Sequence, residues 1–180
     1  LFVGGSWARN NDTIPFARDL SAALGPEHVE VIPGLPYGEY LRTLSQGVFA
    51  IDSYPFGGCN TVADSLYLRK LMITWEGDAW YNRIGSQMIR EVGLGELAAT
   101  SSKAYVEITL RLLHDDGWRE SLERRLQDVD LAQTTFSTRH AGSFQTALDY
   151  LIANHDHLRR QGDRRALHLG RVSQDPRLRP

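Results

Sequence analysis

The chain has 180 residues and a formal net charge of −2, with 42% hydrophobic and 23% charged residues. These proportions exclude a disordered or fibrous chain and are typical of one ordinary globular domain that buries a sizeable core. No apolar run approaches the roughly 20 residues that a transmembrane helix needs, so we expect no membrane span.

Short apolar runs alternate with helical patterns in the first part of the chain. The first run leads into a glycine-rich turn at residues 4–6, and Gly25 with Pro26 closes the first helical pattern. Pro36 suits the first turn of the second helix. The elements predicted here are a strand at 1–3, a helix at 13–24, a strand at 29–32, a helix at 36–44 and a strand at 48–51.

The alternation continues through the rest of the chain. Asp78 is the predicted N-cap of one helix, and Ser101 or Ser102 is the predicted N-cap of the next. This order predicts an α/β fold: a Rossmann-like parallel sheet with helices on both faces, whose ligands bind beyond the carboxyl ends of the strands. The predicted elements are helix 60–70, strand 71–74, helix 78–92, edge strand 97–99, and helices 101–114, 118–128 and 143–154.

The charge distribution separates a C-terminal tail from the rest of the chain. Seven arginines against two aspartates give residues 158–180 a balance of +5, which leaves about −7 for residues 1–157. We therefore predict a domain at 1–157 and a basic tail, disordered or extended, at 158–180. The tail has no interleaved aromatic residues and the domain is acidic, so we expect no nucleic-acid partner.

The segment between the strand at 48–51 and the helix at 60–70 has the features of a phosphate-binding loop. Backbone N–H groups at a helix start have no intrahelical partner, and the helix dipole favours an anion there. Gly57 and Gly58 would let a phosphate approach the backbone closely. A strand, a glycine turn, a helix and a second strand make one βαβ unit, so this loop lies where such folds bind nucleotides.

Asp64 lies about one turn into this helix, where a carboxylate can accept hydrogen bonds from ribose hydroxyls. Simpler interpretations stay open for each of these residues. Gly57 and Gly58 can form only a tight turn, Asp64 can be a solvated acid that complements the helix dipole, and Asn60 and Thr61 can merely cap the helix.

Several segments, in order and spacing, resemble one group of GT-B glycosyltransferases. This family joins eukaryotic O-GlcNAc transferase with the cytoplasmic bacterial N-glycosyltransferases that modify adhesins. The run Pro55-Phe-Gly-Gly-Cys-Asn-Thr61, with Asp64 three residues on, resembles the family's nucleotide-sugar loop. The other segments that carry the resemblance are 34–41, 51–55, 71–74, 77–78, 83–87, and 93–97 with Tyr105.

The resemblance implies the C-terminal domain of a GT-B fold and the UDP-sugar-binding half of an enzyme. That enzyme would be an inverting, metal-independent hexosyltransferase, cytoplasmic, which transfers glucose or a GlcNAc-like sugar to a protein or peptide acceptor. It would need no cofactor besides the UDP-sugar donor. By position in the family, the residues that bind the UDP-sugar are Gly57, Gly58, Cys59, Asn60, Thr61, Asp64, Tyr37 and Tyr40.

The chain departs from the family's pattern in ways that limit this expectation. Cys59-Asn60-Thr61 stands where the O-GlcNAc transferases have histidine-threonine-threonine, which is nearer to the asparagine-rich bacterial loops. The family's important lysine lies on a strand that would precede Leu1. We therefore expect the catalytic residues and the N-terminal half upstream of Leu1, and a chain that is inactive alone.

Two other functions compete with the glycosyltransferase hypothesis. One is a non-catalytic Rossmann-like interaction domain that has lost the sugar site, which the change at Cys59 permits. The other is an epimerase of the GT-B type, although no histidine or acidic base can be placed near the sugar.

A few further residues have types that can serve a functional role. Trp75, Trp80 and Tyr81 are either core residues or a contact for the sugar or uracil. Arg83 and Gln87, four apart, indicate a surface pair. Residues 155–157 hold two histidines that share no helix face, so we expect no metal site. No base lies near Cys59 in the sequence, which argues against a nucleophile there.

Overall fold

The computed structural model describes residues 2–3, 13–32, 34–138 and 141–162. The chain divides into two compact units, residues 1–135 and residues 136–180. The predicted turn at residues 4–6 and most of the predicted basic tail lie outside the described residues. None of the helices in the described ranges combines the length and the apolar character that crossing a membrane requires.

All the strand pairs described in the first unit are parallel. β1 (Phe2–Val3) pairs with β2 (Val31–Ile32). In the second sheet, β4 (Met72–Trp75) lies between β3 (Ala50–Ile51) and β5 (Ala98–Ala99), with Ala50 opposite Met72 and Thr74 opposite Ala98. The predicted parallel α/β architecture is confirmed, although most strands are shorter than the apolar runs that predicted them.

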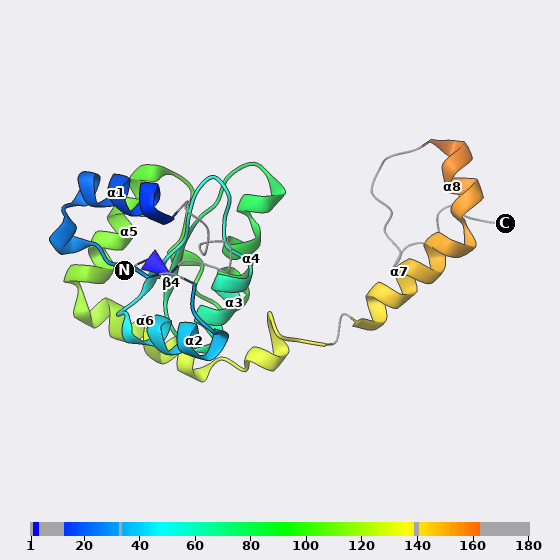
Figure 1. The fold of residues 1–180 in the computed structure, drawn as a ribbon. Helices are drawn as coiled ribbons and strands as arrows, with labels where there is room; N and C mark the ends of the chain where they lie inside the picture. Colours follow the sequence, from blue (N-terminus) through cyan, green and yellow to red (C-terminus); the bar gives the residue numbers. More distant parts are fainter. Residues whose placement is uncertain (1, 4–12, 33, 139–140, 163–180) are drawn as a thin grey trace. The chain divides into compact units, whose positions relative to one another are not determined.

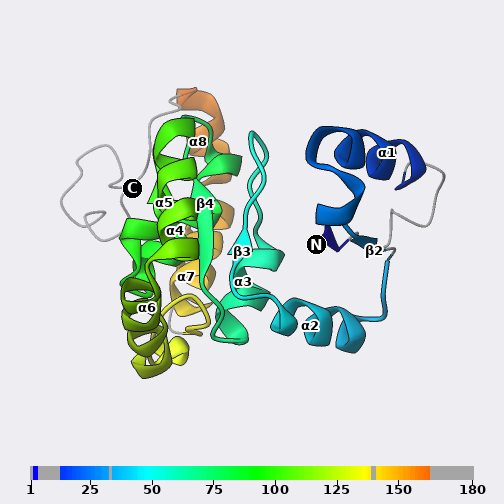
Figure 2. The same cartoon turned by 90° about the vertical axis from the view of Figure 1, so that its left-hand side faces the viewer.

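Helices cover both faces of the larger sheet, as predicted. Figure 1 shows α3 and α4 on one side of β4 and α5 on the other. α2 leads from β2 to β3 and lies beside α3 (Figure 2). The helices of this unit are α1 (Thr13–Leu24), α2 (Tyr37–Gln46), α3 (Asn60–Tyr67), α4 (Ile84–Glu91), α5 (Ser102–His114) and α6 (Asp116–Asp128). Short 3-10 turns stand at Pro26–His28, Trp80–Asn82, Gly95–Leu97 and Leu131–Gln133.

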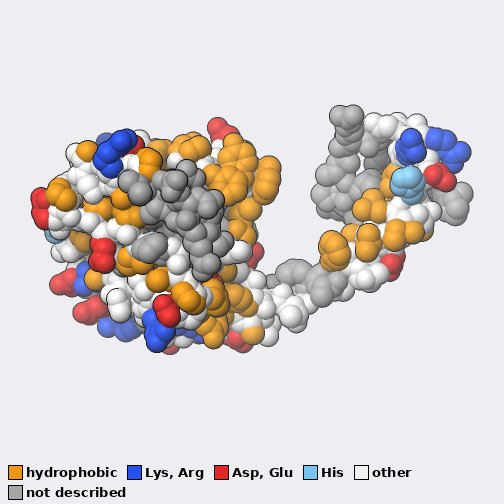
Figure 3. Space-filling model, in the orientation of Figure 1, with side chains coloured by type: hydrophobic (Ala, Val, Ile, Leu, Met, Phe, Trp, Pro, Cys, Tyr) orange, Lys and Arg blue, Asp and Glu red, His pale blue; other side chains and the backbone are white. Residues whose placement is uncertain are grey.

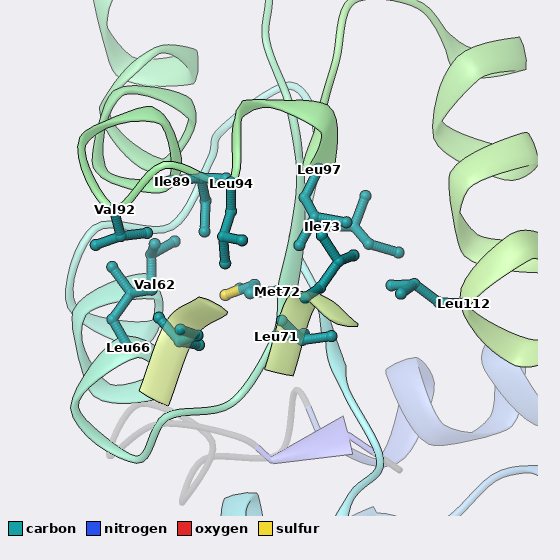
Figure 4. Packing of buried hydrophobic residues seen from close by; sticks show 12 residues of the cluster. Val62, Leu66, Leu71, Met72, Ile73, Ile89, Val92, Leu94, Leu97 and Leu112 are labelled. Carbon is teal, nitrogen blue, oxygen red and sulfur yellow. The ribbon is translucent and has the colours of Figure 1, made fainter. Parts of the chain in front are cut away.

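The hydrophobic core lies against both faces of β4. Successive strand residues point to opposite faces, and Figure 4 shows Met72 and Ile73 directed away from each other. Val62 and Leu66 of α3 lie on one side of the strand, and Leu112 of α5 lies on the other (Figure 4). Each such side chain, fully removed from water, stabilises the fold by about 1.5–3 kcal/mol. This packing makes β4 and its flanking helices the rigid base of the unit.

Helix α3 ends at Tyr67, three residues before the predicted end. Arg69 has a left-handed backbone, with φ 56°, and Lys70 N donates to Ser65 O at 2.8 Å, which closes the helix in the manner of a Schellman motif. The Arg69 guanidinium then donates to the carbonyls of Leu126 and Val129. The left-handed position at residue 69 favours glycine, but an arginine there supplies hydrogen bonds to carbonyl groups at the C-terminal end of α6.

The predicted helix caps are correct for α5 and wrong for α4. The Ser101 side chain accepts from Ala104 N at 3.2 Å, which confirms Ser101 as a cap. Asp78 caps no helix: a 3-10 turn at Trp80–Asn82 intervenes, and α4 begins at Ile84. The turn is formed by bonds from Asn82 N to Ala79 O and from Arg83 N to Trp80 O, and a bond from Gly77 N to Asn82 O joins it to the segment after β4.

The second unit contains α7 (Ala141–Ala153) and α8 (His155–Gln161) in the described residues. The predicted domain boundary between residues 157 and 158 falls inside α8, whereas the compact units meet between Thr135 and Phe136. In α8, His155 Nδ1 lies 3.2 Å from Asp156 Oδ1.

The substitution Leu66→Ala tests the core. We expect it to lower the free energy of unfolding by about 2–5 kcal/mol, because it removes buried atoms and leaves a cavity. The control is Leu113→Ala on α5, whose side chain is 52% exposed and should change stability by no more than about 0.5 kcal/mol. Urea unfolding followed by circular dichroism measures both, and equal losses would contradict the described core.

Candidate functional site

The loop at residues 52–59 joins the carboxyl end of β3 to the start of α3. Because the strands are parallel, the segment 76–78 after β4 and the residues after β5 lie at the same edge of the sheet. The loop is therefore at the edge where parallel α/β folds bind their ligands. Its predicted position is confirmed by the structure.

Asp52, the first residue after β3, is buried and holds the loop in shape. Its Oδ1 accepts hydrogen bonds from Ser53 N at 2.9 Å and from Gly58 N at 2.7 Å. Burial raises the pKa of the Asp52 carboxyl, while the two N–H donors act to lower it. Asp52 was not among the predicted site residues, although an aspartate at the end of a strand, five residues before a glycine pair, is a usable signal.

Three glycines pack around the Asp52 carboxylate. A Cβ on Gly57 would lie 3.2 Å from Asp52 Oδ2, and a Cβ on Gly58 would lie 2.9 Å from Asp52 Oδ1. The third is Gly85 in the first turn of α4, where a Cβ would lie 3.2 Å from Oδ2. The close approach that Gly57 and Gly58 were predicted to allow is thus made, in the chain itself, by a carboxylate.

The start of α3 offers backbone donors beyond this glycine pair. The first bond of the helix runs from Ala63 N to Cys59 O at 3.0 Å, so the N–H groups of Asn60, Thr61 and Val62 precede it. Cys59 is the N-cap residue and makes no side-chain capping bond. Asn60 and Thr61 are exposed and lie inside the helix, so the alternative that their side chains cap it is wrong.

Asp64 meets two tyrosines of α2. Tyr37 donates its hydroxyl to Asp64 Oδ1 at 2.7 Å, and the rings of Tyr37 and Tyr40 stack with centroids 6.0 Å apart. This hydrogen bond is the largest cause of the raised pKa of Tyr37, while burial first and Asp64 second raise the pKa of Tyr40 to about 12. Among the described residues, nothing accepts or donates at the buried Tyr40 hydroxyl. The structure thus brings together three residues predicted to bind the nucleotide.

The aromatic residues at this edge form stacked pairs between the loops. Tyr54 stacks on Trp75 with centroids 4.0 Å apart, and Phe56 stacks on Tyr81 at 5.7 Å. Trp80 is 72% exposed, so it is not a core residue, whereas Trp75 packs against the loop. Figure 3 shows hydrophobic side chains gathered above α4 at the edge of the first unit.

A pocket of about 830 Å³ lies beside this aromatic edge. Arg83 and Gln87 do not bond to each other as a surface pair: Arg83 Nε donates to Gly77 O, and Gln87 donates to Glu91. Arg90 and Glu76, which both line the pocket, form an ion pair. The residues that line the pocket are Glu76, Asp78, Trp80, Arg83, Ile84, Gln87, Met88, Arg90, Glu91 and Thr135.

Comparison with known proteins connects this geometry to protein glycosyltransferases. No family model matches the chain. The chain is 25% identical over 107 residues to the probable UDP-N-acetylglucosamine–peptide N-acetylglucosaminyltransferase SPINDLY of Petunia hybrida, which covers 59% of the chain and 12% of that relative. It is 28% identical over 130 residues to the UDP-glucose:protein N-β-glucosyltransferase of Actinobacillus pleuropneumoniae, which covers 71% of the chain and 21% of the relative.

The structural comparison agrees with the sequence comparison. A mutant O-GlcNAc transferase of Thermobaculum terrenum superimposes with a TM-score of 0.66 and 26% identity, over 79% of this chain and 27% of that one. The chain thus spans between about a tenth and about a quarter of the length of the proteins it matches. In sequence and in its GT-B-type fold, the chain is similar to one part of an O-GlcNAc transferase and of a bacterial protein N-glucosyltransferase.

Proposed function

We propose that this chain is the UDP-sugar-binding half of an inverting, metal-independent glycosyltransferase that transfers a hexose to a protein acceptor. One observation carries the proposal: the loop after β3 presents the start of α3 at the ligand edge of the sheet, with Asp64 one turn further along. The names of the relatives supply the UDP-sugar donor and the protein acceptor.

The diphosphate would bind at the start of α3. Cys59, Asn60 and Thr61 are exposed at this helix start, where an anion gains from the helix dipole. The N–H groups of Asn60 and Thr61 precede the first bond of the helix, from Ala63 N to Cys59 O. The N–H of Gly58 is already bonded to Asp52, so Gly58 would contribute shape rather than a hydrogen bond. Asp64 would accept from the ribose hydroxyls, beside Tyr37 and Tyr40.

Under this proposal, the chemical step is a single displacement at the sugar. A nucleophile of the acceptor attacks the anomeric carbon, the bond from that carbon to the β-phosphate oxygen breaks, and UDP leaves with the electron pair. The N–H groups at the helix start stabilise the negative charge that develops on the β-phosphate. Donors of this kind do the work that a metal ion would otherwise do. The group that takes the proton of the acceptor would come from the N-terminal half of the enzyme.

A second hypothesis is a non-catalytic interaction domain that keeps the fold without the sugar site. The observation in its favour is that the Gly58 N–H and one Asp64 oxygen are occupied by other residues of the chain. Under this hypothesis the chain binds no UDP, and the full-length protein neither hydrolyses UDP-sugars nor transfers the sugar.

A titration with UDP decides between the two hypotheses. We expect saturable binding by calorimetry. We expect Asp64→Asn to weaken UDP binding by about 10–100-fold, because a hydrogen bond to a charged group contributes about 1.5–3 kcal/mol. Free pyrophosphate should bind this variant as it binds the unchanged chain. The control is Asp19→Asn, an exposed acid on α1. Absence of saturation at millimolar UDP would reject the proposal.

The substitution Gly58→Ala tests the loop itself. The added methyl would lie 2.3 Å from Thr61 Oγ1 and 2.9 Å from Asp52 Oδ1, so the loop must shift. We expect at least about tenfold weaker UDP binding, equivalent to ~1.4 kcal/mol. Gly142→Ala on α7 is the matched control, because its Cβ would meet nothing within 4 Å. Similar UDP affinity in the two variants would show that the shape of the loop does not matter.

A further inference from the structure

We propose that Asp52 is the positioning residue of the diphosphate loop: its buried carboxylate holds the Gly58 N–H and thereby directs the next amides, at the start of α3, toward the ligand. Asp52 itself does not touch the diphosphate. The inference rests on the proposed function for the identity of the ligand, and on the geometry of the described residues for the role of Asp52.

The hydrogen bonds of Asp52 define one closed turn of the chain. Both N–H donors, from Ser53 and Gly58, bond to the same oxygen, Oδ1. The carboxylate therefore joins the beginning of the loop to Gly58, the residue just before the N-cap residue Cys59. The Gly58 N–H is turned inward, and the donors left for a ligand begin with the next residue. A backbone anchored in this way needs little reorganisation when the anion binds.

The glycines around the Asp52 carboxylate also indicate that this side chain sets the position of the loop. Gly57 and Gly58 come from the loop and Gly85 comes from α4, and a Cβ on any of them would approach an Asp52 oxygen to 3.2 Å or less. A Cβ on Gly85 would also lie 3.2 Å from Gly58 O. Segments from two elements thus close on one carboxylate, which fixes the distance between the loop and α4.

The backbone of Asp52 is itself held by the core. Asp52 N donates to Ile73 O of β4 at 2.9 Å, which extends the sheet by one bond beyond β3. Tyr105 of α5 donates its hydroxyl to Asp52 O at 2.5 Å. The backbone of the residue that shapes the loop is therefore bonded to both β4 and α5. A loop fixed in this way transmits the rigidity of the core to the ligand edge.

The charge of Asp52 is of the wrong sign for a site that binds an anion. The useful property of the side chain is therefore its hydrogen-bond acceptor, which the carbonyl oxygen of asparagine can supply at the position of Oδ1. Asp52→Asn should keep the loop, whereas Asp52→Ala should release it. This contrast separates positioning of the loop from an electrostatic contribution to the site.

Calorimetric titrations with UDP and with inorganic pyrophosphate test the inference. We expect Asp52→Ala to weaken the binding of both ligands by the same factor, at least about tenfold (~1.4 kcal/mol). The factor is the same because the loop would contact the diphosphate, which both ligands contain. We expect Asp52→Asn to stay within about threefold of the unchanged chain, a difference of ~0.65 kcal/mol. The matched control is Asp115→Asn, which replaces another aspartate that accepts a backbone N–H bond, from Trp118 at 2.9 Å.

Amide hydrogen exchange at Gly58, measured by NMR, gives a readout that needs no ligand. It should be faster in Asp52→Ala and unchanged in Asp52→Asn. If Asp52→Ala does not fold, Tyr105→Phe is measured in its place. We expect this variant also to bind both ligands more weakly, but by a smaller factor. Unchanged affinity and exchange in Asp52→Ala would overturn the inference, as would equal losses in the Ala and Asn variants. If the unchanged chain binds neither ligand, the proposed function fails, while the exchange data still judge the role of Asp52 in the loop.

Discussion

A single buried carboxylate joins the sheet to the loop that carries the candidate site. Taking the Asp52 side chain out of water disfavours its charged form, which is why burial raises its pKa. The fold offsets this cost with two backbone donors, from Ser53 and Gly58. These same bonds determine where the loop turns and where α3 begins. The ligand edge of the unit therefore depends on a polar interaction that lies below the surface.

The apolar core fixes the position of Asp52 and so of its hydrogen bonds to the loop. Asp52 follows β3 directly, and β3 pairs with β4, whose residues Met72 and Ile73 are buried between helices on both faces. A change in the position of Asp52 would have to move a strand that is packed on both sides. Protein interiors are close-packed and transmit such displacements. The shape of the loop is thus linked to the free energy of core packing, although no residue of the loop belongs to the core.

The sequence predicted the features that depend on local patterns. Alternating apolar runs and helical patterns indicated the parallel sheet, and the glycine pair followed by Asp64 indicated the loop and its helix. Asp78 failed as a cap because the chain first forms a 3-10 turn, with bonds from Asn82 N to Ala79 O and from Arg83 N to Trp80 O. The bond between Tyr37 and Asp64 spans 27 residues, so no local pattern contains it. Polar contacts between distant segments require the fold to be known.

This contact between Tyr37 and Asp64 also shows what the ligand would have to change. Asp64 Oδ1 is occupied by the Tyr37 hydroxyl in the chain without ligand, so a ribose must either use Oδ2 or replace the tyrosine. Replacement would lower the apparent affinity by the fraction of molecules in which Asp64 is free. Sharing would instead place the tyrosine beside the ribose as a second contact. Tyr37 is 63% exposed, so its ring can leave without disturbing the core. Under the proposed function, Asp64 is thus bonded to an exposed side chain that a nucleotide could displace, whereas Asp52 is bonded to backbone N–H groups of the loop itself.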